Sequence, residues 1–337
     1  MNQEHAARRL GKGSVPAPAA PLPAALAAYA TGEPAAPYEL LADREDGTVV
    51  RCGGVVAKAH AADSDCDDLA VRMRIAADRA LAGVLLPPLR PGADLLRGRP
   101  VSLWPYGVPV DPGLPEAAPW EAAARLLAAL HQVPLDGLPG PLPPMRGPAK
   151  LSRALGRLSR AASLGHRGHR FEPGLGPAVV RDAARALPAW VRGTAPAPPG
   201  GVLCHGDLHL GQLVRGGAAD GWRLIDVDDL GVGTPAWDLA RPAAWYAAGV
   251  LSADAWGRFL DAYRAAGGPA AGPPGRDPRP ALDLAARALT VQTAALALAR
   301  SAENRRRLDD VERLMVESCA RIAALPPDTA ARAPAQH

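Results

Sequence analysis

The stretch Val202–Leu239 constrains what this 337-residue chain can fold into more than any other part of the sequence. One short apolar run precedes a polar loop that carries Asp207 and Gln212, and a later apolar run ends at Asp226. Short apolar strands that carry polar residues at their ends are typical of a rigid scaffold that presents reactive groups. The stretch therefore predicts a functional site whose polar residues are positioned by strands.

The spacing of three polar residues in this stretch indicates phosphoryl transfer. Asp207 lies five residues before Gln212 and 19 residues before Asp226. Phosphoryl transfer from a nucleotide requires a carboxylate that orients the attacking hydroxyl and accepts its proton, and oxygen ligands that hold Mg²⁺ against the phosphates. We interpret Asp207 as the catalytic residue and Gln212 and Asp226 as the magnesium ligands. Each residue alone would be interpreted as a turn or capping residue, but the order and spacing of all three favour the chemical interpretation.

A resemblance to the aminoglycoside phosphotransferase family, the small-molecule branch of the kinase-like fold, is carried by the same motifs. They are His205-Gly-Asp207-Leu-His209-Leu-Gly-Gln212, Ile225-Asp226 and Asp238-Leu239-Ala240, and the Asp-to-amide spacing is that of the protein-kinase catalytic loop. The resemblance implies an α+β fold with two lobes, a small antiparallel-sheet N-lobe and a larger, mostly helical C-lobe. It also implies ATP or GTP as the phosphoryl donor, Mg²⁺ as a cofactor and a small-molecule hydroxyl as the acceptor.

The other polar residues of the loop are expected to support the site. We expect His205 and His209 to brace the loop, and the resemblance implies that Asp238 holds it through its backbone amides. The chain departs from the family's asparagine by having Gln212, which is one methylene longer but still presents a carbonyl to Mg²⁺. Maltokinase-like sugar kinases are similar to this chain in having His-x-Gly-Gln at that point.

Lys58 is the residue expected to contact the nucleotide phosphates from the N-lobe. It ends an apolar run and is one of only three lysines in a chain that otherwise uses arginine. Arginine does not replace the compact ammonium group at a crowded phosphate, so the retained lysine indicates a role. In the family a glutamate on the following helix pairs with this lysine. The helix expected at residues 67–82 contains no glutamate, and the acidic partner of Lys58 is left open.

Apolar periodicity and segments rich in glycine and proline divide the chain into four parts. These are a flexible extension at 1–37, the N-lobe at 38–107, the C-lobe at 108–325 and a disordered tail at 326–337. A short helix is expected at 24–30 within the extension. The expected strands are 38–42, 48–52, 55–58, 84–89 and 99–104. The expected helices are 67–82, 120–132, 151–164, 177–191, 237–248, 253–266, 281–301 and 306–324, with a loop at 135–150.

Composition argues against several other classes of protein. The net charge is +4, but the arginines are scattered among acids, which argues against a nucleic-acid partner. The four cysteines lie far apart without the spacing of a zinc site, which is typical of reduced thiols in a cytoplasmic protein. We find no apolar run of the ~18 residues that a membrane span requires, so no membrane partner is expected. The oligomeric state is left open.

The acceptor is the least constrained part of the prediction. An aminoglycoside is a polycation and needs a site lined with carboxylates. Asp228 and Asp229 can begin such a lining, and acids of the last helices can extend it: Glu303, Asp309, Asp310, Glu312 and Glu317. The same acids can equally face solvent and pair with neighbouring arginines.

Several acceptors and one other class of protein therefore stay open. The acceptor is an aminoglycoside or another antibiotic, in which case the chain confers antibiotic resistance, or it is a neutral sugar, as for maltokinase-like kinases. The alternative to an enzyme is a non-catalytic binding protein that keeps the kinase-like fold.

Overall fold

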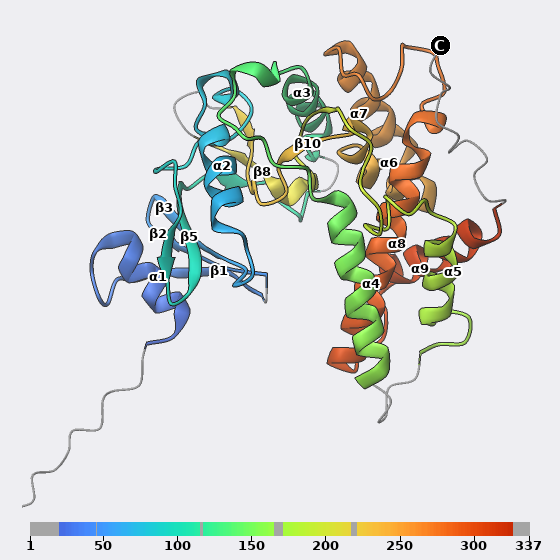
Figure 1. Cartoon of the computed structure of the whole chain (residues 1–337), viewed down its shortest axis with the longest axis horizontal. Coiled ribbons are helices and arrows are strands. Elements are labelled where there is room, and N and C mark those ends of the chain that lie inside the picture. The colour runs from blue at the N-terminus through green and yellow to red at the C-terminus, as the bar shows by residue number, and fades with distance from the viewer. Residues whose placement is uncertain (1–19, 45, 115–116, 165–170, 217–220, 326–337) are drawn as a thin grey trace, which may run out of the picture.

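The computed structural model describes residues 20–325, apart from 45, 115–116, 165–170 and 217–220. The expectations for residues 1–19 and for the tail at 326–337 lie outside the described residues. An N-terminal lobe that contains a sheet lies beside a larger, mostly helical lobe (Figure 1). This arrangement confirms the predicted α+β fold with two lobes.

The N-lobe is built on a five-stranded antiparallel sheet with the strand order β1-β2-β3-β5-β4. The strands are β1 (Glu39–Arg44), β2 (Gly47–Cys52), β3 (Val55–His60), β4 (Asp94–Leu96) and β5 (Arg99–Pro105). Strand β3 lies in the middle, where Lys58 is paired with Val49 of β2 and with Ser102 of β5. Because both edges of β3 are hydrogen-bonded, the backbone that carries Lys58 is fixed in position.

Helix α1 (Leu22–Thr31) packs on this sheet, so the structure differs from the expected flexible extension at 1–37. Leu26 and Ala27 are fully buried in one cluster with Val50 of β2. The helix ends at Gly32, whose φ of 78° is a left-handed conformation that glycine adopts without strain. The described residues before Tyr38 therefore belong to the N-lobe, and the other predicted domain boundaries stay predictions.

The segment between β3 and β5 differs from the expectation in two places. Helix α2 (Cys66–Ala76) is shorter than the expected helix at 67–82, because Asp78 accepts a hydrogen bond from the Ala80 amide and begins a separate 3₁₀ turn. The expected strand at 84–89 is wrong. Leu85 instead forms an isolated bridge with Leu224, and the two prolines that follow it cannot donate the hydrogen bonds of a sheet.

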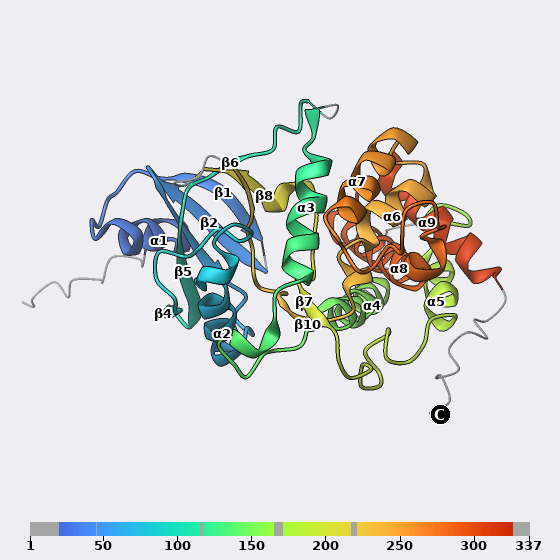
Figure 2. The same cartoon turned by 90° about the horizontal axis from the view of Figure 1, so that it is seen from above.

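The C-lobe is mostly helical. Its helices are α3 (Trp120–His131), α4 (Gly147–Leu164), α5 (Pro177–Arg185), α6 (Ala240–Ala248), α7 (Ala253–Ala265), α8 (Arg279–Asn304) and α9 (Asp310–Ala323). Helices α4, α5, α6 and α9 pack against α8, and α3 packs against α7. Figure 2 shows α3 between the N-lobe sheet and the remaining helices. Helix α8 is long and apolar enough to cross a membrane, which the sequence analysis did not expect, but 61% of its apolar window is buried inside the protein. We interpret α8 as a core helix.

Three further helix boundaries were placed wrongly, in addition to the end of α2 and the start of α4. Local polar groups or proline explain each of the three. Helix α5 ends at Arg185 rather than residue 191, shortly before Pro188. Helix α6 follows a 3₁₀ turn at Pro235–Trp237 instead of including it. Helix α9 begins at Asp310 rather than 306, because Asp309 and Glu312 form a capping box.

Two small sheets hold the polar stretch between the lobes. Strand β7 (Val202–Cys204) pairs with β10 (Gly231–Gly233), and β8 (Leu213–Arg215) pairs with both β6 (Val108–Pro109) and β9 (Trp222–Leu224). The loop at 205–212 connects β7 to β8, and the loop at 225–230 connects β9 to β10. Each loop is therefore anchored by a strand at both ends, although the sequence analysis did not predict β10.

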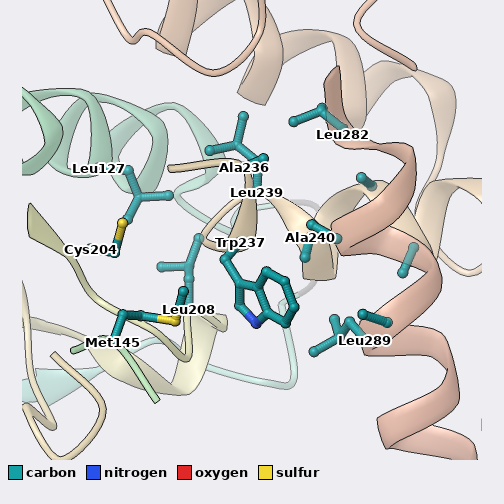
Figure 3. Close-up of a cluster of buried hydrophobic side chains, with 14 of the residues drawn as sticks. Leu127, Met145, Cys204, Leu208, Ala236, Trp237, Leu239, Ala240, Leu282 and Leu289 are labelled. Carbon is teal, nitrogen blue, oxygen red and sulfur yellow. The ribbon is translucent and has the colours of Figure 1, made fainter. Parts of the chain in front are cut away.

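Helix α4 begins earlier than expected, inside the predicted loop at 135–150, because its first residue packs against Trp237. A methyl group on Gly147 would lie 1.9 Å from the indole nitrogen, so only glycine fits there. Figure 3 shows Trp237 between Leu208 and Met145 on one side and Leu289 of α8 on the other. The start of α4 is therefore fixed beside the loop at 205–212.

The docking of α1 can be tested with one core substitution. Leu26→Ala removes a fully buried side chain from the N-lobe cluster, and we expect it to lower the free energy of unfolding by about 2–5 kcal/mol. The matched control is Leu95→Ala in β4 of the same sheet, where the side chain is 68% exposed and the expected change is within about 0.5 kcal/mol. Equal effects of the two substitutions in urea denaturation would show that α1 is not docked.

Candidate active site

Asp238 holds the loop at 205–212 from the C-lobe side, as the resemblance implies. Its two carboxylate oxygens accept hydrogen bonds from the backbone amides of His205 at 2.6 Å and Gly206 at 2.7 Å. Nε2 of His131 lies 3.0 Å from the same carboxylate, and Nδ1 of His131 lies 2.8 Å from the Tyr263 hydroxyl. Burial alone raises the pKa of Asp238, but hydrogen bonds and the nearby histidines lower it below its usual value. An ionised carboxylate thus fixes the beginning of the loop.

The same region contains a group that resembles a metal site by distance alone. His131, Cys204 and Asp238 offer ligand atoms within 4.8 Å of one another. Both ring nitrogens of His131 and both oxygens of Asp238 are already hydrogen-bonded. Burial also raises the pKa of the Cys204 thiol well above its usual value. We therefore interpret the group as a structural network.

Two further contacts brace the loop. Nε2 of His205 lies 2.8 Å from the backbone oxygen of Ile225, which connects the loop to the one that carries Asp226. Gly206 has a φ of 84°, and a methyl group there would lie 2.4 Å from the backbone oxygen of Asp229. The close approach of the two loops therefore requires glycine at position 206.

His209 is placed to support the end of the loop. Its Nδ1 accepts a hydrogen bond from the Gly211 amide at 3.1 Å. Burial, together with the charge of Arg241, lowers the pKa of His209 to about 4. A neutral ring is required for Nδ1 to accept this bond, so the charge state and the geometry agree.

Asp226, Gln212 and Lys58 converge from three different elements. The ammonium nitrogen of Lys58 lies 2.8 Å from Oδ1 of Asp226, and the amide nitrogen of Gln212 donates to Oδ2 at 3.3 Å. Asp226 has a φ of 67°, which is uncommon for a residue other than glycine. Such strain persists where the surroundings hold the residue in place, and it occurs often at functional sites.

The acidic partners of Lys58 are Asp226 and Asp228, at 2.8 and 3.0 Å, and neither lies on α2. Burial alone lowers the pKa of Lys58, but these two carboxylates raise it above its usual value. Helix α2 contributes Arg72 instead of a glutamate, and this buried side chain donates from Nε to the backbone oxygen of Leu230 at 2.8 Å. The lobes are therefore connected by two basic residues of the N-lobe.

His60 is a further residue of β3 that the sequence analysis missed. It lies two residues after Lys58 and therefore on the same face of the strand. Its Nδ1 is 2.9 Å from Oδ1 of Asp228, and its Nε2 is 2.7 Å from the Ser102 hydroxyl. Side chains two residues apart in a strand lie on the same face, so the position of His60 relative to Lys58 could have indicated its role from the sequence.

Asp207 is held between two cations that the sequence analysis also missed. Nζ of Lys150 lies 2.7 Å from Oδ2, and a guanidinium nitrogen of Arg241 lies 2.7 Å from Oδ1. Burial alone raises the pKa of Asp207, but Lys150 and Arg241 lower it well below its usual range. Asp207 is therefore ionised near neutral pH, with its orientation fixed from α4 and α6.

The residues present fit a hard divalent cation. Mg²⁺ prefers oxygen ligands, and Asp226 offers a carboxylate beside the side-chain amide of Gln212. Within the described part of the chain, no hydrogen bond to the side-chain oxygen of Gln212 is present, so this oxygen is available as a ligand. The side-chain nitrogen of Gln212 donates to Asp226, the carboxylate that Lys58 also contacts.

The model of the phosphotransferase enzyme family matches residues 72–282, which is more than half of the chain. The chain belongs to the phosphotransferase enzyme family. This membership confirms the predicted resemblance and the interpretation of the chain as an ATP-dependent phosphotransferase for small molecules. No curated protein matches the chain.

Several solved structures share the fold of this chain at low sequence identity. A choline/ethanolamine kinase family protein from Mesorhizobium loti is 19% identical with a TM-score of 0.57, and the match covers 90% of this chain and 94% of that one. A thermostable mutant of the aminoglycoside phosphotransferase APH(4)-Ia is 14% identical with a TM-score of 0.54, covering 86% and 95%. Spectinomycin phosphotransferase APH(9)-Ia, in complex with ADP and spectinomycin, is 12% identical with a TM-score of 0.52, covering 85% and 91%.

The lowered pKa of His209 can be used to test the structure of the loop at 205–212. The usual pKa of 6.5 is lowered to about 4 in the folded protein, so the unfolded chain binds a proton at a higher pH than the folded chain. Stability is therefore lost as the pH falls from 6.5 towards 4. We expect His209→Asn, which can still accept the Gly211 amide, to lose less stability than the wild type between about pH 7 and about pH 5.

Melting temperatures at the two pH values measure this difference. If wild type and His209→Asn lose the same stability over this range, His209 is not held neutral by the loop.

Proposed function

We propose that the chain transfers the γ-phosphoryl group of ATP or GTP, bound as its Mg²⁺ complex, to a hydroxyl group of a small molecule. The observation that carries this proposal is the convergence of Lys58 and Gln212 on Asp226 within 2.8–3.3 Å, beside Asp207. Lys150 links Asp207 to Asp229 at 2.7 and 2.8 Å, and Asp229 lies three residues after Asp226 in the same loop. These contacts support the proposal that the predicted base and the predicted metal ligand act in one site.

Asp207 orients the acceptor in this proposal. Each of its oxygens already accepts one hydrogen bond, from Lys150 or from Arg241, and a carboxylate oxygen can accept another. The acceptor hydroxyl donates to Asp207 and passes its proton there as its bond to the γ-phosphorus forms and the bond from that phosphorus to the departing nucleoside diphosphate breaks. The transition state of phosphoryl transfer is loose, so a carboxylate with a low pKa serves mainly by positioning the hydroxyl.

Lys58 and the metal ligands act on the donor side. Mg²⁺ would supply positive charge against the phosphates of the donor when bound. Asp226 and Gln212 would hold it, and the ammonium group of Lys58 would contact the phosphates from β3. Lys58 now pairs with Asp226 and Asp228, and nucleotide binding would exchange part of this pairing for phosphate oxygens.

Charge around Asp207 favours a neutral or anionic acceptor over a polycation. Lys150 and Arg241 contact Asp207 directly. Arg146 lies 3.8 Å from Asp229, whose other oxygen is 2.8 Å from Lys150. Three cations thus accompany two carboxylates here, so the local charge is positive and repels a further ammonium group.

Three of the five acids expected to extend an aminoglycoside site are used elsewhere. Glu303 pairs with Arg157 through two contacts of 2.9 and 2.6 Å. Glu312 pairs with Arg306 at 2.6 and 2.5 Å, and Asp309 caps α9. These pairs support the alternative of arginine-paired surface acids, so a sugar-like acceptor without multiple amines is the acceptor we propose.

A panel of matched acceptors tests the reaction and the acceptor class together. Glucose, gluconate and glucosamine share one scaffold and differ in charge, and an aminoglycoside is added as a polycation. We expect phosphoryl transfer from Mg²⁺·ATP to be faster for the neutral or anionic members than for the amine-bearing ones. The measurement is product formation by mass spectrometry together with ADP release.

Asp207→Asn is the variant that tests the reaction itself. It removes the carboxylate that orients the hydroxyl, and we expect kcat to fall by about 10²–10⁴-fold. Asp254→Asn, at a side chain that is 82% exposed, is the matched control and keeps its activity. Full activity of Asp207→Asn contradicts the proposed mechanism, whereas preferred transfer to the aminoglycoside contradicts only the proposed acceptor.

A further inference from the structure

Lys150 is the one described lysine to which the proposed reaction has assigned no role. The whole chain has three lysines among 38 basic residues. Lys12 lies outside the described residues, and the other two, Lys58 and Lys150, both lie in the site. A chain that uses arginine almost everywhere keeps lysine at these two places.

The two lysines have the same environment. Lys58 bridges Asp226 and Asp228 at 2.8 and 3.0 Å, and Lys150 bridges Asp207 and Asp229 at 2.7 and 2.8 Å. A compact ammonium group fits between two carboxylates, whereas a guanidinium group is a wide planar fork. The scarcity of lysine and the shared geometry are independent observations, and both indicate a role for Lys150 in the reaction.

Helix α4 is fixed so that Lys150 reaches the site. The Met145 amide donates to the backbone oxygen of Val232 at 2.9 Å, and the Arg146 amide donates to that of Asp229 at 3.3 Å. Gly147 then packs against Trp237, and no larger residue fits. Lys150 follows within the first turn of the helix.

We infer that Lys150 is a positioning residue for phosphoryl transfer, a role that rests on the proposed function. It holds Oδ2 of Asp207 in the orientation that receives the acceptor hydroxyl, and it is itself oriented by Asp229. Arg241 holds the other oxygen, so the carboxylate is fixed from two helices. A structural role alone would consist of neutralising the buried charge of Asp229.

The first test is Lys150→Met, which keeps an unbranched side chain of nearly the same length and removes its charge. We expect kcat for ADP release to fall about 100-fold, as for a small misplacement of a reacting group, while the KM for ATP stays unchanged because Lys150 does not contact the donor side. The matched control is Arg160→Met, which removes an exposed cation from the same helix and keeps kcat. An unchanged kcat in Lys150→Met overturns the inference.

The second test separates positioning from charge neutralisation. Loss of Lys150 leaves the negative charge of Asp229 without its lysine partner. Asp229→Asn removes that charge, and Lys150→Met is then measured in the Asp229→Asn background. A further fall of about 100-fold in kcat supports action on Asp207, and no further fall shows that Lys150 only neutralises Asp229. Wild-type protein that transfers no phosphoryl group to any acceptor or to water overturns the proposed function, and this inference with it.

Discussion

Pairing of four aspartates with two lysines is the interaction on which the rest of the site depends. Asp207, Asp226, Asp228 and Asp229 lie within two adjacent loops, and carboxylates this close repel one another unless cations lie between them. Lys58 comes from the N-lobe sheet and Lys150 from a C-lobe helix, and each contacts two of the four carboxylates. The phosphotransferase site therefore needs both lobes to be in place before its charges are balanced.

The surrounding structure fixes the backbone to which these charges are attached. Asp238 holds the first loop by its amides, Gly206 allows the two loops to touch, and Trp237 fixes the start of α4. The buried cluster around Trp237 reaches α8, the central helix of the C-lobe (Figure 3). Positions of the charged side chains thus depend on apolar packing well away from them.

Much of this arrangement could be predicted from the sequence, because it is local. The order and spacing of Asp207, Gln212 and Asp226 within one stretch indicated the reaction, and the rarity of lysine indicated Lys58. The partner of Lys58 could not be predicted, because it lies 168 residues away in the chain and only folding brings it near. Lys150 was missed although the same argument from rarity applied to it, because the glycine and prolines before it indicated a loop rather than the start of a helix.

The central claim is that Asp226 and Gln212 hold a metal ion against the phosphates of a nucleotide. The most direct measurement is the rise in melting temperature produced by a non-hydrolysable ATP analogue, with and without Mg²⁺, in wild type and in Asp226→Asn. The account predicts a rise in the wild type that requires Mg²⁺ and is lost in Asp226→Asn. An equal rise without Mg²⁺, or a normal response of Asp226→Asn, would contradict it.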